Sequence, residues 1–143
     1  MNSSIFDILF YVFLKFYFMF FKILFYFITC TMSELIYHFI KLKSYVQLYH
    51  WKTTNYERHV ASGNLYSELD KKIDRFIEIF QGSKRINVSK NLVLKNITDA
   101  ILLETLDSFV AFFYSQKLKS DLSNLRDDIV GDIHHTLYLF SLM

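Results

Sequence analysis

The chain has 143 residues, no proline and only three glycines, with 16 basic residues against 14 acidic ones. This length allows one domain with its own core, and the near absence of helix-breaking residues favours an all-α fold. The balanced charge, without a basic block, argues against nucleic-acid binding, and a single cysteine, Cys30, excludes a disulfide within one chain.

The first 31 residues form a hydrophobic N-terminal segment. Between Ile8 and Ile28 only Lys15 and Lys22 are charged, and 21 residues in a helix span about 31 Å, enough for a bilayer core. Two interpretations stay open. Either residues 8–28 are a membrane anchor, or Met32 is the natural start and the preceding residues, rich in types that A/T-only codons encode, are translated upstream sequence. A helical domain is expected over residues 32–143.

The first two helices of this domain follow from amphipathic order. Ser33 with Glu34 suits a helix N-terminus. Asn55 suits the cap of a second helix, with Arg58 as its third residue, and Gly82 is typical of a helix end. The expected apolar faces recur near a period of 3.6: Leu35, Ile36, Phe39, Ile40, Val46 and Tyr49 in the first helix, and Val60, Leu65, Leu69, Ile73, Phe76, Ile77 and Phe80 in the second.

The segment from Ser83 to Asn96 has no helical period and is expected to be extended. Fourteen extended residues reach about 46–50 Å, whereas a 26-residue helix is about 39 Å long. The segment can therefore run the whole length of the domain. This long crossover allows the second and third helices to run parallel.

Two further helices complete the domain. The third is expected from about Ile97 to Gln116, with Asn96 and Asp99 placed for its cap. The fourth is expected to begin near Asp121 and carries one apolar stripe: Leu122, Leu125, Ile129, Ile133, Leu137 and Phe140. Four amphipathic helices with one long crossover predict a four-helix bundle, preceded by the hydrophobic N-terminal helix. The surplus of aromatic residues, 16 Phe and 10 Tyr, predicts contacts between subunits.

The chemistry of the chain centres on the first helix pair. His50 and His59 lie on either side of a short polar break, and Asp70, Asp74 and Glu78 follow at intervals of four residues. Residues four apart lie roughly 5–6 Å from each other on one side of a helix. Such acids repel one another unless a cation or a basic neighbour relieves them. Imidazole and carboxylate together suit iron, zinc or manganese.

The same residues carry a family resemblance. His50-Trp51 closing a helix, His59 opening the next, and an Asp-x-x-x-Glu pair at Asp74 and Glu78 resemble the first helix pair of ferritin-like proteins of the Dps type. The chain is closer still to an uncharacterised ferritin-like family of phages and large DNA viruses, which Leu125–Phe140 also resembles. The likeness covers about residues 33–142 and implies a ferritin-like four-helix bundle with one long crossover.

The resemblance also implies a site. His50, His59, Asp74 and Glu78 match the di-iron ligands of the Dps type, with Asp70 a weaker candidate, and in that type the histidines face the acids of the two-fold mate. Iron would be bound and oxidised at the dimer interface of a homodimer or higher oligomer. Two departures stand out: the further carboxylate of the Dps type aligns with Gly63, and the loop between the histidines is about three residues shorter.

A second interpretation of these residues needs no metal. His50 at a helix end favours the helix dipole, and the acids alternate with Lys71, Lys72 and Arg75, as on an ordinary solvated face. The protein is then a catalytically inactive structural or host-interaction bundle of viral origin. Of the other histidines, His134-His135 is a weaker candidate, since adjacent helical side chains diverge by about 100°, and His38 is expected to be structural. Without an anchor, the expected location is the host cytoplasm or the virion.

Overall fold

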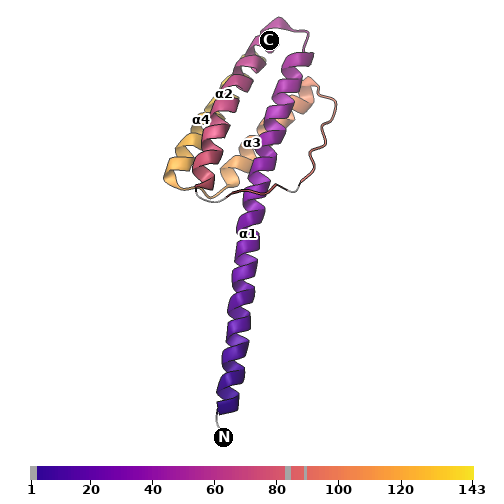
Figure 1. Ribbon diagram of the computed structural model, residues 1–143. Helices are drawn as coiled ribbons and strands as arrows, with labels where there is room; N and C mark the ends of the chain where they lie inside the picture. Colours follow the sequence, from indigo (N-terminus) through magenta and orange to yellow (C-terminus); the bar gives the residue numbers. More distant parts are fainter. Residues whose placement is uncertain (1–2, 83–84, 89) are drawn as a thin grey trace.

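The computed structural model describes the backbone of residues 3–82, 85–88 and 90–143, and the side chains within these ranges except those of residues 3–8 and 23–31. The described chain is all helical apart from its connections, with α1 (Ser3–Lys52), α2 (Tyr56–Gln81), α3 (Asp99–Ser115) and α4 (Ser120–Ser141). The C-terminal part of α1 and the other three helices pack as a four-helix bundle (Figure 1).

The connectivity of the bundle matches the expected long crossover. α1 ascends, α2 descends beside it, the crossover returns along the bundle, α3 descends, and α4 ascends to the C-terminus (Figure 1). Thus α2 and α3 run parallel. The contacting pairs are α1 with α2, α2 with α4, α1 with α3, and α3 with α4. The two parallel helices therefore lie diagonally across the bundle.

A cluster of phenylalanines forms the centre of the core. Phe39, Phe76 and Phe113 are each at most 1% exposed, and their ring centroids lie 5.2–5.3 Å apart in edge-on arrangements. Phe109 adds a fourth ring, 5.2 Å from Phe113. Edge-to-face packing at these distances stabilises aromatic pairs beyond their buried area. Two expected core positions are wrong: Ile40 is 46% and Val60 41% exposed. Ile40 borders an open groove between α1 and α2 rather than the interior of the bundle.

The ends of α2 confirm the signals read from the sequence. The Asn55 side chain accepts a hydrogen bond from the Arg58 main-chain N–H at 2.9 Å, which satisfies an otherwise unpaired N–H of the first turn. Gly82 ends the helix at a φ of +54°, a conformation that residues with a side chain rarely adopt. For α3 the expected cap was wrong. Thr98, not Asn96 or Asp99, accepts from the Ile101 N–H.

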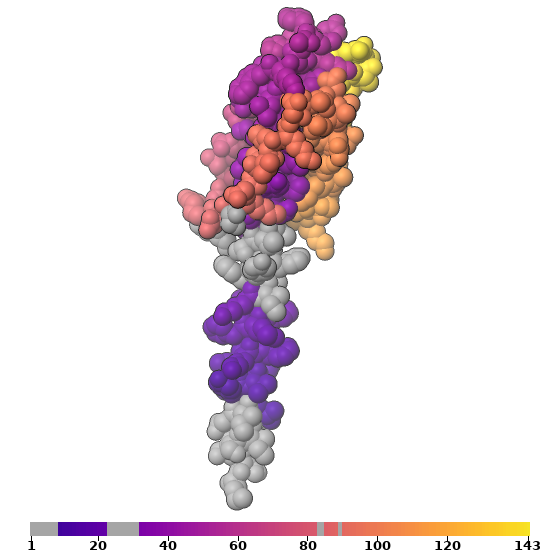
Figure 2. Space-filling model, turned by 90° about the vertical axis from the view of Figure 1, so that its right-hand side faces the viewer, coloured from indigo at the N-terminus to yellow at the C-terminus, as the bar shows by residue number. Residues whose placement is uncertain are grey.

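The first helix differs from the expectation. No helix begins at Ser33, because α1 runs without a break from Ser3 to Lys52 and its N-terminal part projects from the bundle (Figure 2). Between residues 9 and 22 the large apolar side chains are 48–68% exposed. No helix in the described ranges is both long enough and apolar enough to cross a membrane. The span expected over residues 8–28 includes side chains, those of Ile8 and residues 23–28, outside the described ones.

Candidate metal centre

Two histidines meet where α1 ends and α2 begins. The short connection of residues 53–55 places His50, in the last turn of α1, beside His59, in the first turn of α2. Their rings stack with centroids 4.0 Å apart and planes 22° apart. The main-chain N–H of Thr53 bonds to Tyr49 and the Asn55 cap starts α2. Both helix ends are therefore fixed by hydrogen bonds, and the ring pair sits on a rigid turn.

A reciprocal pair of hydrogen bonds holds the two rings. His50 Nδ1 lies 2.9 Å from the main-chain oxygen of His59, and His59 Nδ1 lies 2.8 Å from that of His50. A carbonyl oxygen only accepts hydrogen bonds, so each Nδ1 carries the hydrogen and donates it. In the neutral rings each Nε2 then has a free lone pair. A backbone partner on one ring nitrogen is the usual way in which the other is prepared to bind a metal.

Gly63 explains how the His50 ring fits against α2. A Cβ atom placed on Gly63 would lie 2.8 Å from His50 Cε1 and 3.0 Å from Nδ1, whereas carbon atoms normally approach to about 3.5–4.0 Å. Residue 63 is therefore next to an imidazole ring. Any larger side chain at residue 63 would displace that ring.

The acidic candidates lie farther along the same helix pair. Asp70 forms an ion pair with Lys43 of α1, which accounts for it without a metal. Asp74 and Glu78 are exposed, and neither forms a side-chain hydrogen bond or ion pair among the described residues. His59 and Asp74 are fifteen residues apart in one helix, or about 22 Å. One copy therefore brings the histidines together but not the acids to them, and no group of three or more potential ligands forms within the described part of the chain.

A polar cluster links Tyr49 of α1, Arg58 of α2 and Asp99 of α3 at the surface. The Tyr49 hydroxyl donates to Asp99 Oδ1 at 2.7 Å, and Arg58 forms an ion pair with the same carboxylate. Burial, followed by the bond to Asp99, raises the pKa of Tyr49. The hydrogen bond to Tyr49 is the largest cause that raises the pKa of Arg58. Sequence reasoning missed this cluster, because Asp99 is 50 residues from Tyr49 and no local spacing links them.

The remaining histidines form no second centre in the described structure. His134 and His135 are exposed on α4, and the nearby Asp132 pairs with Lys72 rather than with His135. His38 stacks on Phe112 with centroids 3.8 Å apart and lies 3.5 Å from Glu34. Burial, only partly opposed by Glu34, lowers the pKa of His38. This contact set fits the structural role expected for His38.

A family model matches residues 50–140, more than half of the chain, and its description is a family of unknown function, DUF5856. The chain belongs to this family. The DUF5856 match begins at His50 and includes His59, Gly63, Asp74 and Glu78, so the whole candidate centre lies inside it. No curated protein sequence and no solved structure matches the chain.

Proposed function

We propose that this DUF5856 protein is a ferritin-like metal-binding bundle of the Dps type that holds a divalent cation, iron(II) in the first place, between two copies. The reciprocal hydrogen bonds of His50 and His59 carry this proposal. Each ring is held through Nδ1 and leaves Nε2 available, which is how histidine is usually prepared to bind a metal, whereas a solvated surface histidine needs no fixed tautomer.

Asp74 and Glu78 supply the other half of the centre. Both are exposed and unpaired among the described residues, so binding a cation breaks no existing ion pair. Carboxylates hold Fe(II) and Fe(III), and imidazoles complete the set. An open position on the metal would admit the oxidant: two Fe(II) would each give one electron to peroxide, which takes up two protons and becomes two waters, and the carboxylates would hold the Fe(III) formed.

The two halves meet if two copies pair antiparallel through the outer face of α1 and α2. Placing His59 of one copy opposite Asp74 of the other puts the two-fold axis near Tyr66 and Ser67, with equivalent sites on either side. Ser44 and Ser67 are small residues on this face and allow close approach, and the Tyr66 hydroxyl at the axis already accepts a hydrogen bond from Gln47 of its own copy. Ile40 and Trp51 are 46% and 66% exposed on it, and apolar residues of this kind are typical interface anchors.

Anaerobic Fe(II) titration of the full-length chain tests the metal binding. We expect wild-type binding to be lost in the Asp74→Asn/Glu78→Gln variant and unchanged in Asp107→Asn/Asp128→Asn, which neutralises two exposed carboxylates of α3 and α4. If the wild type takes up no Fe(II), or the first variant binds normally, the proposal fails.

Mixing variants tests whether the centre is shared. His59→Gln keeps the acids, and Asp74→Asn/Glu78→Gln keeps the histidines, so each alone is expected to be inactive. In co-expressed mixtures, half of the sites in each heterodimer combine intact halves, and binding should return to about a quarter of the wild-type level. A site within one copy would give no return. Light scattering measures the dimer independently.

A second candidate is a metal-free structural or interaction bundle of viral origin. The glycine at residue 63, where the Dps type has a carboxylate, favours it, as do the exposed apolar side chains of α1. The anaerobic Fe(II) titration distinguishes the two candidate functions. An intact dimer without Fe(II) uptake supports the second.

A further inference from the structure

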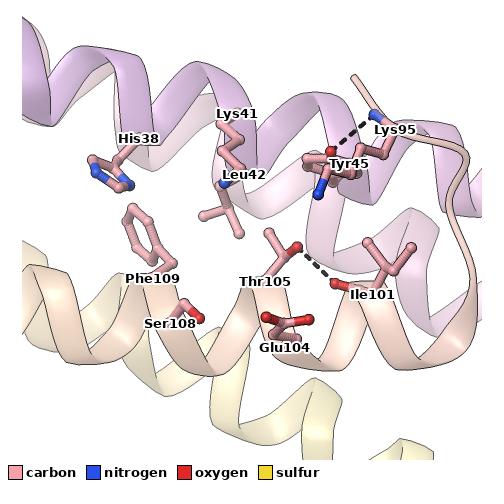
Figure 3. Close-up of a pocket in the computed structure, with 10 residues that line it drawn as sticks. All are labelled: His38, Lys41, Leu42, Tyr45, Lys95, Ile101, Glu104, Thr105, Ser108 and Phe109. Atoms are coloured by element: carbon pink, nitrogen blue, oxygen red, sulfur yellow. Dashed lines mark hydrogen bonds between the residues drawn. The ribbon is translucent and has the colours of Figure 1, made fainter. Parts of the chain in front are cut away.

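A separate pocket lies between α1, α3 and the crossover, and neither His50 nor His59 lines it (Figure 3). Its volume is about 190 Å³. Leu42 and Phe109, 1% and 3% exposed, form an apolar floor. The pocket exists because Thr105 and Ser108 occupy positions on α3 that face α1, where a larger apolar residue would close the gap between the helices.

Two lysines border this pocket without a partner of their own. Lys41 comes from α1 and Lys95 from the crossover, and neither ammonium group forms an ion pair or hydrogen bond among the described residues. Elsewhere on the bundle, Lys43, Lys72 and Lys90 each pair with a carboxylate. Glu104 lines the α3 side of the pocket, also unpaired. The lining therefore carries a net charge of +1 when His38 is neutral.

The position of Lys95 is fixed by a buried group. The Tyr45 hydroxyl, on a residue 3% exposed, accepts the main-chain N–H of Lys95 at 3.0 Å (Figure 3). The crossover is thereby held against α1 where it borders the pocket. Among the described residues nothing accepts the hydroxyl hydrogen of Tyr45. The unused Tyr45 hydroxyl hydrogen and the ammonium groups of Lys41 and Lys95 together favour a negatively charged ligand with hydrogen-bond acceptors.

His38 closes the opposite end of the pocket as an uncharged ring. It stacks on Phe112, and burial lowers its pKa, so at neutral pH it adds apolar surface rather than charge. The pocket thus has an apolar interior and positive charge at its rim. Lys41 and Lys95 converge on the rim from two different elements.

We propose that this pocket binds a small monocarboxylate with an apolar body, the carboxylate at Lys41 and Lys95 and the body over Leu42 and Phe109. At about 30 Å³ per water, the cavity holds roughly six waters, which limits the ligand to the order of ten non-hydrogen atoms. Glu104 repels a second negative charge, so dianions and polyphosphates fit poorly. The site is independent of the metal centre.

Benzoate and benzyl alcohol are the test probes, since they share a ring and differ in charge. We expect benzoate to bind the full-length chain and benzyl alcohol to bind at least tenfold more weakly. Binding is measured by ligand-observed NMR and by calorimetry, with the same detergent in every sample because the apolar side chains of residues 9–22 are exposed. Lys41→Met and Lys95→Met should each weaken benzoate about tenfold. Lys117→Met, which removes an exposed unpaired lysine outside the pocket, should leave binding unchanged.

A second variant tests the location without altering charge. Ser108 is exposed and faces the pocket, so Ser108→Leu should fill the cavity, keep the fold and abolish benzoate binding. Unchanged helical circular dichroism verifies the fold. Three results would each overturn the proposal. The two probes could bind equally, Lys117→Met and Lys41→Met could bind benzoate equally, or Ser108→Leu could bind benzoate as the wild type does. Fe(II) uptake should be the same with and without benzoate. If benzoate does not bind, the proposed metal centre is therefore not contradicted.

Discussion

Replacing Gly63 by alanine separates fold stability from metal binding. The new Cβ would lie 2.8 Å from His50 Cε1 and 3.0 Å from Nδ1, so the His50 ring must rotate away. This costs the bond between His50 Nδ1 and the His59 carbonyl, about 0.5–1.5 kcal/mol. Alanine in place of glycine within a helix returns about 0.5–1 kcal/mol. We therefore expect a free energy of unfolding within about 1 kcal/mol of wild type.

Metal affinity should respond quite differently to the same substitution. Loss of the partner that orients a metal-binding histidine typically costs 10- to 100-fold in affinity, and we expect such a drop in anaerobic Fe(II) titration. Gly131→Ala is the matched control, since its Cβ would meet no atom within 4 Å. It should gain about 0.5–1 kcal/mol and bind Fe(II) as wild type does. If Gly63→Ala bound Fe(II) as tightly as Gly131→Ala, the link between Gly63, the ring pair and the metal would be refuted.

Three further predictions concern the rest of the bundle. Burial lowers the pKa of His38 below 6.5, so the unfolded state binds more protons and the free energy of unfolding should fall as the pH drops below 6.5. His38→Gln should flatten this slope in urea titrations. Tyr49→Phe removes the hydroxyl bonded to Asp99 and should cost about 0.5–1.5 kcal/mol, against no change for Tyr56→Phe, 78% exposed. Phe113→Ala, fully buried between Phe39 and Phe76, should cost about 3–5 kcal/mol, and a loss under 1 kcal/mol would contradict the packing described.

The sequence predicted those parts of the fold that depend on local chemistry. The Asn55 cap and the Gly82 stop each rest on a short segment, and the structure confirms both. The crossover is long, as expected, but runs to Thr98, because α3 begins at Asp99 rather than near Ile97. The start at Ser33 was wrong, because residues 3–52 contain no proline or glycine and nothing ends the helix before the bundle. The outward positions of Ile40 and Val60 depend on which neighbours surround each helix, and periodicity does not supply that.

The candidate site was also predicted only in its local parts. The sequence identified His50 and His59, since two histidines around a short turn must be neighbours in any helical hairpin. It did not predict their stacking or their tautomers, which depend on carbonyl oxygens nine residues away along the chain. The Lys43 partner of Asp70 was also missed, because it comes from α1, 27 residues earlier. Asp74 and Glu78 stay as predicted ligands whose test requires a second copy.

The short loop and Gly63, the two departures that the resemblance to the Dps type implies, have one physical explanation. A loop about three residues shorter leaves only residues 53–55 between the helices, and this draws His50 and His59 close enough for each Nδ1 to reach the other's carbonyl. Stacked in this way, the His50 ring lies against residue 63, where only glycine leaves room. The short turn and the missing carboxylate are therefore consequences of one arrangement. The proposed centre then keeps two imidazoles and two carboxylates, His50, His59, Asp74 and Glu78, without the further carboxylate that the resemblance to the Dps type implies.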